Sequence, residues 1–193
     1  MPPKTRYTRD AVLEAAIDVV RRDGLRAVSA RSVAKALDAS TAPVSAAFDS
    51  MRALVEALVE RILVGLVATL EAAEGSDPLQ AAAFAFARFT ADEPNFYEAL
   101  FLLPHATPPD WVGVRRSFSA RLDRSPRFAS LSTRQRDALA WRASVVTHGI
   151  CIEIWSGRWS RTDDAALRRL VDQLVEPITA TYLRDSEDST SRT

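Results

Sequence analysis

Residues 29–48 read SARSVAKALDASTAPVSAAF, and the pattern of this stretch decides how the rest of the chain is interpreted. Ser29 is a residue type that caps helix N-termini, and Val28 and Val33 occupy the two positions of a hydrophobic staple. The spacing of the apolar residues that follow predicts a helix over 30–37. A short break then separates this helix from a second short one.

The second helix has one apolar face and one face of small side chains. Ser40 or Thr41 can cap it, and Pro43 falls in its first turn, where a missing N–H costs nothing. Val44 and Phe48, four residues apart, face the same core as the preceding helix. The outward positions are Thr41, Ala42, Ser45 and Ala46. This arrangement is typical of a helix-turn-helix, whose second helix enters the major groove of DNA, although an ordinary helical hairpin has the same pattern.

Residues 8–63 as a whole resemble the N-terminal domain of the TetR (tetracycline repressor) family of transcriptional regulators. The matching positions, without a gap, are Ile17, Gly24, Leu25, Val28, Ser29, Arg31, Ser32, Val33, Ala34, Leu37, Ser40, Thr41, Ala42, Pro43, Val44, Phe48 and Leu54. The resemblance implies an all-α fold with a helix-turn-helix DNA-binding head (1–50), a linker helix (51–73) and an effector-binding and dimerisation domain (74–184). We expect the polar residues 185–193 to form a disordered tail.

Helix signals along the chain predict about nine helices and no strand. The first helix runs from Thr8 to Asp23, and we expect Gly24 to end it in the left-handed conformation. Ser50 caps the linker helix. Further helices are predicted at 78–91, from Pro94 to Pro104, from Asp110 to Pro126, at 132–156 with Ser132 or Thr133 as its cap, and at 162–184 with Thr162 as its cap.

The composition of the 193-residue chain, 47% hydrophobic and 26% charged, is typical of a soluble globular protein. Its formal net charge is zero, although residues 1–52 carry nine basic and six acidic side chains. Cys151 is the single cysteine, which excludes an internal disulfide and fits a reducing compartment. No apolar run approaches the ~18 residues that a membrane span needs. We therefore expect a cytoplasmic protein without a signal peptide.

The predicted DNA-binding face consists of Ser29, Arg31, Thr41, Ala42, Pro43, Ser45, Ala46 and Arg52. Ser29 and Arg31 would reach phosphates, and the small residues would let the second helix sit deep in the groove. Most members of the family carry tyrosine at the position of Ser45 and lysine at that of Met51, and both usually bind phosphates. Arg52 can replace the missing lysine one position along the chain.

The predicted effector pocket is mainly aromatic. Its candidate residues are Phe84, Phe89, Phe96, Tyr97, Phe101, Trp111, Phe118, Trp141 and His148, although each of them can also serve simply as a core residue. Within 78–118 only Arg88 and Glu98 are charged residues at positions expected to be buried, which favours a small apolar or aromatic effector over an anionic one. His148 and Cys151 lie three residues apart on one helix face, but we expect no metal, because the chain has only two histidines and one cysteine. We expect neither catalysis nor a cofactor, because the chain has no phosphate-binding loop and no nucleophile elbow.

These patterns together predict a ligand-responsive transcriptional regulator, in its simplest form a repressor, that binds a pseudo-palindromic operator. The resemblance implies a homodimer that pairs the helices at 132–156 and 162–184 of each subunit, because two-fold related heads read two half-sites. The alternative is a dimer of the same architecture with weakened DNA binding, acting as a small-molecule or partner-binding protein. The missing anchors at Ser45 and Met51 are what favours that alternative.

Overall fold

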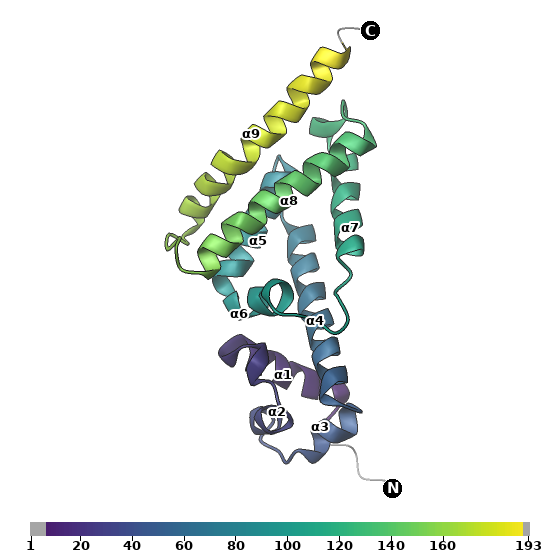
Figure 1. Ribbon diagram of the computed structural model, residues 1–193, viewed down its shortest axis with the longest axis vertical. Helices are drawn as coiled ribbons and strands as arrows, with labels where there is room; N and C mark the ends of the chain where they lie inside the picture. Colours follow the sequence, from purple (N-terminus) through teal and green to yellow (C-terminus); the bar gives the residue numbers. More distant parts are fainter. Residues whose placement is uncertain (1–6, 191–193) are drawn as a thin grey trace. The chain divides into compact units, whose positions relative to one another are not determined.

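The computed structural model describes residues 7–190, except for the side chains of residue 113, of residues 115–118 and of residues 185–190. This part of the chain is helical and contains no strand (Figure 1). Its α-helices are α1 (Arg9–Asp23), α2 (Ala30–Ala36), α3 (Ala42–Ala47), α4 (Met51–Ala72), α5 (Pro78–Asp92), α6 (Pro94–Tyr97), α7 (Trp111–Asp123), α8 (Thr133–Trp155) and α9 (Asp164–Thr190). The predicted all-α fold with about nine helices is confirmed.

The chain divides into two compact units. The head unit comprises the residues up to Gly65 together with Glu93–Pro109, and the body unit comprises Leu66–Asp92 together with the residues from Asp110 onward. The linker helix α4 is continuous and contributes to both units. We predicted that 74–184 form a single domain, whereas the structure groups Glu93–Pro109 with the head.

The C-terminal end of α1 is held by the segment that follows α5. Arg21 donates from Nε to Glu93 Oε1 at 2.9 Å, and its guanidinium lies 5.0 Å from the centroid of the Phe96 ring. Asn95 Nδ2 donates to the carbonyl of Arg21 at 2.9 Å. This bond satisfies one of the carbonyls that a helix C-terminus leaves without an intrahelical partner. These contacts explain why Glu93–Pro109 belongs to the head unit.

The turn between α2 and α3 is a Schellman motif closed by Asp38. The Asp38 N–H donates to the carbonyl of Lys35 at 3.2 Å, and the Ala39 N–H donates to the carbonyl of Ala34 at 3.0 Å. Asp38 has a φ of 50°, the left-handed conformation that glycine adopts most readily. We predicted that conformation for Gly24, and this is wrong: Gly24 has a φ of 83° but a ψ of 164°, outside the left-handed helical region.

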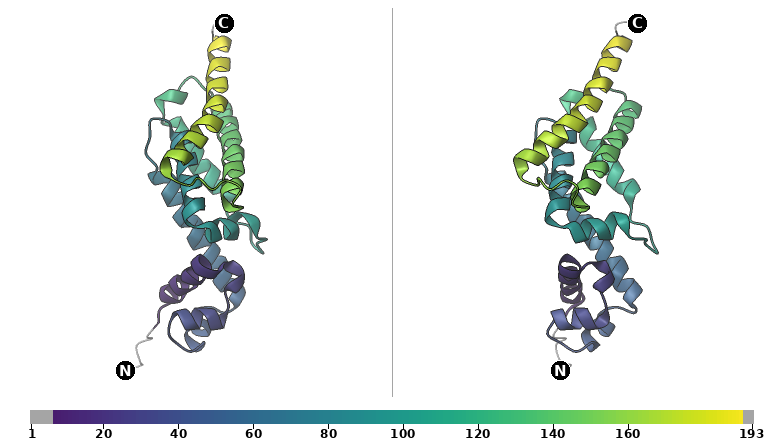
Figure 2. Two further views of the ribbon diagram at one scale, coloured as in Figure 1. Left: turned by 90° about the vertical axis from the view of Figure 1, so that its left-hand side faces the viewer. Right: turned by 60° about the vertical axis from the view of Figure 1, so that its left-hand side comes forward.

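The core of the body unit lies among α5, α8 and α9, each of which packs against the other two. Leu79 of α5, Leu139 of α8 and Leu167 of α9 are fully buried there, and Leu122 adds α7 to the same core. Both views of Figure 2 show α8 and α9 lying side by side. The two long helices therefore each bury one face within the chain.

The starts of α8 and α9 are fixed by side-chain caps. Ser132 and Gln135 form a capping box, in which Ser132 Oγ accepts from the Gln135 N–H and Gln135 Oε1 accepts from the Ser132 N–H. We predicted Thr162 as the cap of α9, but Asp163 takes this position. Its Oδ1 accepts from the N–H of Ala166 at 2.9 Å.

The end of α9 also differs from the prediction. We expected residues 185–193 to be disordered, whereas α9 continues to Thr190, and 191–193 lie outside the described residues. None of the helices in the described part of the chain is long and apolar enough to cross a membrane.

The helix predicted from Pro94 to Pro104 is split in two. Only α6 is α-helical, and Glu98–Leu102 forms a single π-helical segment, in which the Leu103 N–H donates to the Glu98 carbonyl at 3.2 Å. Two short 3₁₀ segments, Leu25–Ala27 and Pro126–Phe128, were not predicted. Such turns are common connectors between helices, and their sequences carry no periodic signal.

Candidate functional site

The outer face of α3 carries only small side chains. Val44 and Phe48 are buried, as is Val33 of α2, and the two helices are in contact. On the opposite side the structure exposes Thr41, Ala42, Ser45 and Ala46 and leaves Pro43 half-buried. The helix therefore presents a surface without a bulky side chain, which is the form that lets a helix approach base edges closely.

The start of α2 brings two of the predicted phosphate-binding residues together. Ser29 Oγ accepts from the Ser32 N–H at 3.1 Å, and Ser32 Oγ accepts from the Ser29 N–H at 2.9 Å, so the helix has a reciprocal cap. Arg31 is exposed in the first turn that this cap fixes. A guanidinium at such a place can form two parallel hydrogen bonds with a phosphate.

Arg52, the predicted replacement for a lysine at Met51, has a partner within the head unit. Its Nε donates to Glu56 Oε1 at 3.1 Å, and the Thr107 hydroxyl donates to the same oxygen at 2.9 Å. The bonds from Arg52 and Thr107 hold the pKa of the Glu56 carboxyl below its usual value. Arg52 must leave Glu56, or share it, in order to contact a phosphate.

The residues predicted to line an effector pocket fall into separate groups. In the head unit Phe96 and Tyr97 are buried, and the rings of Tyr97 and Phe101 lie 5.1 Å apart. In the body unit the guanidinium of Arg168 lies 3.9 Å from the centroid of the Phe84 ring. The sequence could not show this division, because it follows from the packing of Glu93–Pro109 with α1.

The other candidates for the pocket differ in burial. Phe89 and Trp111 are half-buried in the body unit, whereas Trp141 is exposed on α8. The side chain of Phe118 lies outside the described residues. The described pocket candidates are therefore divided between the head unit and the body unit, and neither unit contains all of them.

His148 and Cys151 lie about one turn apart on α8 but do not form a reactive pair. The His148 ring makes an edge-to-face contact with Phe86, with centroids 5.1 Å apart, and burial lowers its pKa. Phe86 was not among the predicted pocket residues. Burial raises the pKa of the Cys151 thiol to about 12, although a hydrogen bond with Thr90 acts in the opposite direction. A thiol held in its protonated form is a poor nucleophile and a poor metal ligand.

Metal binding finds no support in the described part of the chain, where no three His, Cys, Asp or Glu residues are grouped so that they could hold an ion. The thiol of Cys151 and the ring of His148 both contact α5 instead, through Thr90 and Phe86. Both residues therefore contribute to the contact between α5 and α8.

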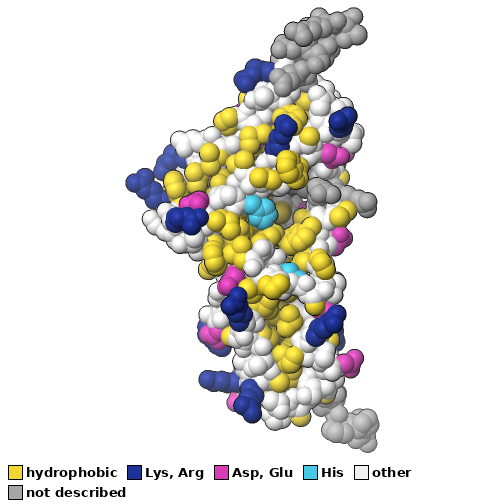
Figure 3. All heavy atoms as spheres, in the orientation of Figure 1, with side chains coloured by type: hydrophobic (Ala, Val, Ile, Leu, Met, Phe, Trp, Pro, Cys, Tyr) yellow, Lys and Arg dark blue, Asp and Glu magenta, His cyan; other side chains and the backbone are white. Residues whose placement is uncertain are grey.

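The outer face of α8 exposes large apolar side chains. Trp141 is 56% exposed, Val145 51% and Trp155 38%, with half-buried Ile152 between them, and Leu174 of α9 is 44% exposed. Figure 3 shows hydrophobic side chains spread over the face that α8 and α9 form. Exposed apolar side chains that gather on one face mark an interaction site rather than ordinary surface.

The sequence contained a signal for this second face. Trp141, Val145, His148, Ile152 and Trp155 are spaced alternately by four and three residues, the repeat of a helix that packs along another helix. The prediction of an effector pocket considered Trp141 and His148 as aromatic residues and did not consider this spacing.

The fold is shared with solved structures, although no protein-family model matches the sequence and no curated protein matches it significantly. A transcriptional regulator from Rhodococcus sp. RHA1 is similar with a TM-score of 0.67 and 18% identity, over 91% of this chain and 97% of that one. A variant of TetR from Acinetobacter baumannii AYE, in complex with minocycline, is similar with a TM-score of 0.61 and 18% identity, over 92% of this chain and 99% of that one. The chain has the TetR fold.

A further similar structure is that of a second protein from Rhodococcus sp. RHA1. This protein, described as having unknown function, is similar with a TM-score of 0.67 and 22% identity, over 96% of this chain and 98% of that one. Each comparison covers nearly the whole of both chains, so the TetR fold extends over the head and the body. At 18–22% identity the similarity establishes the architecture.

Proposed function

We propose that this chain is a transcriptional regulator, in its simplest form a repressor, that binds a pseudo-palindromic operator as a homodimer and responds to a small effector. The observation that carries the proposal is the outer face of α3, which is exposed and free of bulky side chains within a TetR fold. A helix with this surface fits the major groove, where base edges are read directly.

The contacts with DNA divide into two kinds. Thr41 and Ala42 offer methyl groups to thymine, and Ser45 offers a hydroxyl to base edges or phosphate. Arg31 at the start of α2 supplies the charged phosphate contact. The contacts with bases give sequence specificity, and the contact with phosphate gives affinity. Only the phosphate contact should weaken steeply as the salt concentration rises.

The homodimer uses the outer faces of α8 and α9. Each of these helices already buries one face against α5, and the opposite face of α8 exposes Trp141, Val145 and Trp155. A second copy would cover these side chains and remove their apolar surface from water. A two-fold axis at this interface also gives the two heads that a palindromic operator requires.

Gly149 supports the same interface. It lies in the middle of α8, where glycine costs up to about 1 kcal/mol relative to alanine. A Cβ added at Gly149 would meet no atom of the chain within 4 Å, so packing inside the subunit gives no reason for the glycine. Close approach of a helix from a second copy supplies such a reason.

The effector would bind among aromatic side chains of the body unit. Phe86 and His148 are in contact there, and Phe84 and Phe89 lie on the same helix, α5. The A. baumannii TetR variant, of the same fold, is in complex with minocycline. By analogy we propose a small apolar or aromatic ligand for this chain.

The test is binding of the full-length protein to the DNA upstream of its own coding region, at two salt concentrations. We expect sequence-selective binding that weakens steeply with salt, and Arg31→Ala should reduce the salt slope by about 0.9. Arg22→Ala is the matched control, because it removes an exposed arginine of the head that is already paired with Asp23. Binding that does not distinguish this DNA from random sequence would contradict the proposal.

Two observations favour a second candidate function. Ser45 and Met51 lack the phosphate-binding groups typical of the family, and Arg52 is engaged with Glu56. On this view the chain is a TetR-fold dimer that binds a small molecule or a protein and has little affinity for DNA. Weak, unselective DNA binding by a stable dimer would favour it.

A further inference from the structure

Glu56 lies beside one of the proposed phosphate contacts and is hydrogen-bonded to it. It is half-buried on α4, one turn beyond Arg52, and both residues belong to the head unit. Its Oε1 accepts two hydrogen bonds, from Arg52 Nε at 3.1 Å and from the Thr107 hydroxyl at 2.9 Å. One carboxylate oxygen therefore joins the start of α4 to a loop that lies 51 positions further along the chain.

The bond from Thr107 distinguishes this ion pair from an ordinary surface pair. An exposed Arg–Glu pair four residues apart on a helix is weak, because both long side chains lose rotamer freedom when they meet. Here the Thr107 hydroxyl also holds the Glu56 carboxylate, and the Glu56 side chain is 39% exposed against 70% for Arg52. The carboxylate is therefore already held in place, so that most of the entropy cost of pairing falls on Arg52.

The Glu56 carboxylate and a DNA phosphate compete for the same donors. Both anions accept charge-assisted hydrogen bonds from a guanidinium. While Arg52 Nε donates to Glu56, that donor is not available to a phosphate. If Arg52 contacts a phosphate, the negative charge of Glu56 stays close by and repels that phosphate. Both effects lower the affinity of the head for DNA.

We infer that Glu56 is a positioning residue that withholds Arg52 from phosphate and so limits the affinity of the head for DNA. The inference rests on the proposed function, because it concerns how tightly the same head binds its operator. It also has an unusual consequence for a DNA-binding surface. Removing one hydrogen-bonded carboxylate should strengthen binding, and the gain should depend on Arg52.

The experiment measures binding of the full-length Glu56→Gln variant to the upstream DNA at several salt concentrations. Glutamine keeps the size of glutamate and an oxygen that can accept from Thr107, but it removes the charge that attracts Arg52. We expect about threefold tighter binding for each head, together with a salt slope raised by about 0.9 for each head, because the released guanidinium displaces one more counterion. A gain in affinity cannot result from misfolding, so the result is not confused with a loss of stability.

Glu60→Gln is the matched control for charge. Glu60 is an exposed residue of the same helix, one turn beyond Glu56. The substitution removes the same charge from α4 without releasing Arg52. It should change the affinity by less than about twofold, because salt screens an exposed charge.

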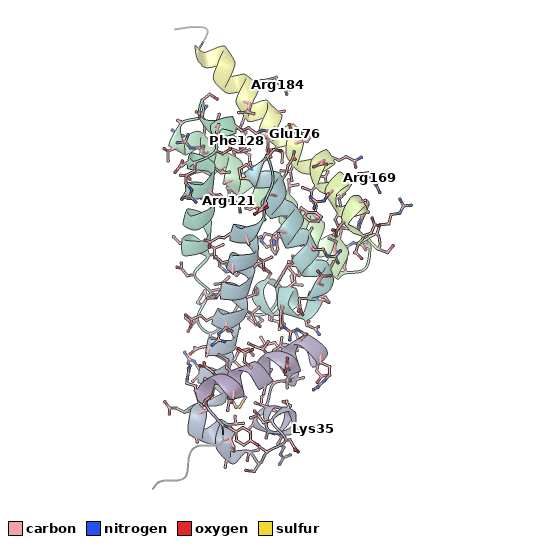
Figure 4. The ribbon with its side chains drawn as sticks, turned by 180° about the vertical axis from the view of Figure 1, so that it is seen from behind. Lys35, Arg121, Phe128, Arg169, Glu176 and Arg184 are labelled. Carbon is pink, nitrogen blue, oxygen red and sulfur yellow. The ribbon has the colours of Figure 1, made fainter. Side chains whose placement is uncertain are left out.

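A double-mutant cycle shows whether Glu56 acts through Arg52. In an Arg52→Ala background, Glu56→Gln should neither tighten binding nor raise the salt slope, because the guanidinium that it releases is absent. In a Lys35→Ala background the full effect of Glu56→Gln should persist. Lys35, labelled in Figure 4, is an exposed cation at the end of α2 in the same unit. A general effect of net charge would appear equally in both backgrounds.

The inference is overturned if Glu56→Gln leaves the affinity unchanged, if Glu60→Gln produces an equal gain, or if the gain persists without Arg52. Failure of the proposed function has a different signature. Wild-type binding that does not distinguish the upstream DNA from random sequence contradicts that function, whereas a gain through Arg52 on both DNAs would still support the inference. Selective wild-type binding with no effect of Glu56→Gln removes the inference alone. If no variant binds DNA, both fail.

Discussion

The outer faces of α3 and α8 are both exposed in a single chain, yet they are built from opposite kinds of side chain. The face of α3 is made of Thr41, Ala42, Ser45 and Ala46, none of which is large. That of α8 is made of Trp141, Val145 and Trp155 with Ile152 between them. The same secondary structure thus presents two surfaces that water solvates very differently.

The difference indicates two kinds of partner. A small, partly polar face would gain little free energy from being removed from water. It fits a hydrated groove whose base edges offer hydrogen bonds. A face with tryptophans gains most from a dry contact, since each aromatic side chain buries a large apolar area. The comparison therefore supports the proposal that α3 contacts DNA and that α8 contacts a second copy of the chain, and each half of the proposal can be tested separately.

The largest expected effect is on the α8 face. We predict that Val145→Glu weakens the dimer by about 3 kcal/mol, or more than a hundredfold, because it places an unpaired charge in a dry interface. Sedimentation equilibrium measures the change directly. DNA binding should fall in parallel, because one head reads only one half-site.

Val112→Glu is the control for this prediction. Val112 of α7 is 49% exposed, close to the 51% of Val145, and it lies outside the α8 and α9 face. The same substitution at the two sites therefore changes surface charge equally. If both variants stayed dimeric, or both dissociated, the face of α8 would not be the interface.

The proposed DNA-binding face can be tested by restoring a phosphate-binding residue at position 51. We predict that Met51→Lys strengthens operator binding by about 1 kcal/mol, or roughly fivefold, and raises the salt slope by about 0.9. Met51 is half-buried at the start of α4, next to the motif. A titration at several salt concentrations gives both quantities. An unchanged slope would show that residue 51 does not face a phosphate.

The orientation of α3 could be predicted from sequence, because apolar spacing alone distinguishes its two faces. Val44 and Phe48 lie four residues apart, and both are buried. The capping residues Ser29 and Ser132 were predictable for a related reason: a cap is a local interaction between residues three apart. Features of this kind need no knowledge of the rest of the fold.

The contacts between helices that determine which residues come together could not be predicted, because they join residues far apart in the chain. Glu93 meets Arg21 across 72 positions, and Arg121 meets Leu70 across 51. The left-handed residue was misplaced for a different reason. Glycine is the usual choice there, and only the backbone shows that Asp38 adopts this conformation while Gly24 does not.

The turn that presents α3 gives the third prediction. Asp38→Gly should raise the free energy of unfolding by about 1 kcal/mol, because glycine adopts a φ of 50° without steric strain. Ala39→Gly is the control, since its φ is not positive and the added backbone freedom should destabilise the protein by about 0.5–1 kcal/mol. Urea unfolding measures both. Equal effects would mean that Asp38 is not strained.

The smallest effect distinguishes two glycines that look alike within the chain. Gly65 of α4 and Gly149 of α8 both occupy exposed positions inside helices, and a Cβ added at either would meet no atom within 4 Å. Helix propensity alone predicts that alanine stabilises each helix by up to about 1 kcal/mol.

If a helix of a second copy approaches Gly149, the added methyl group instead crowds the interface and weakens the dimer by about 1 kcal/mol. Gly65→Ala should then raise the unfolding temperature and leave the dimer constant unchanged, whereas Gly149→Ala should raise that dissociation constant. A Gly149→Ala variant with tighter or unchanged dimerisation would place the contact elsewhere on the face of α8.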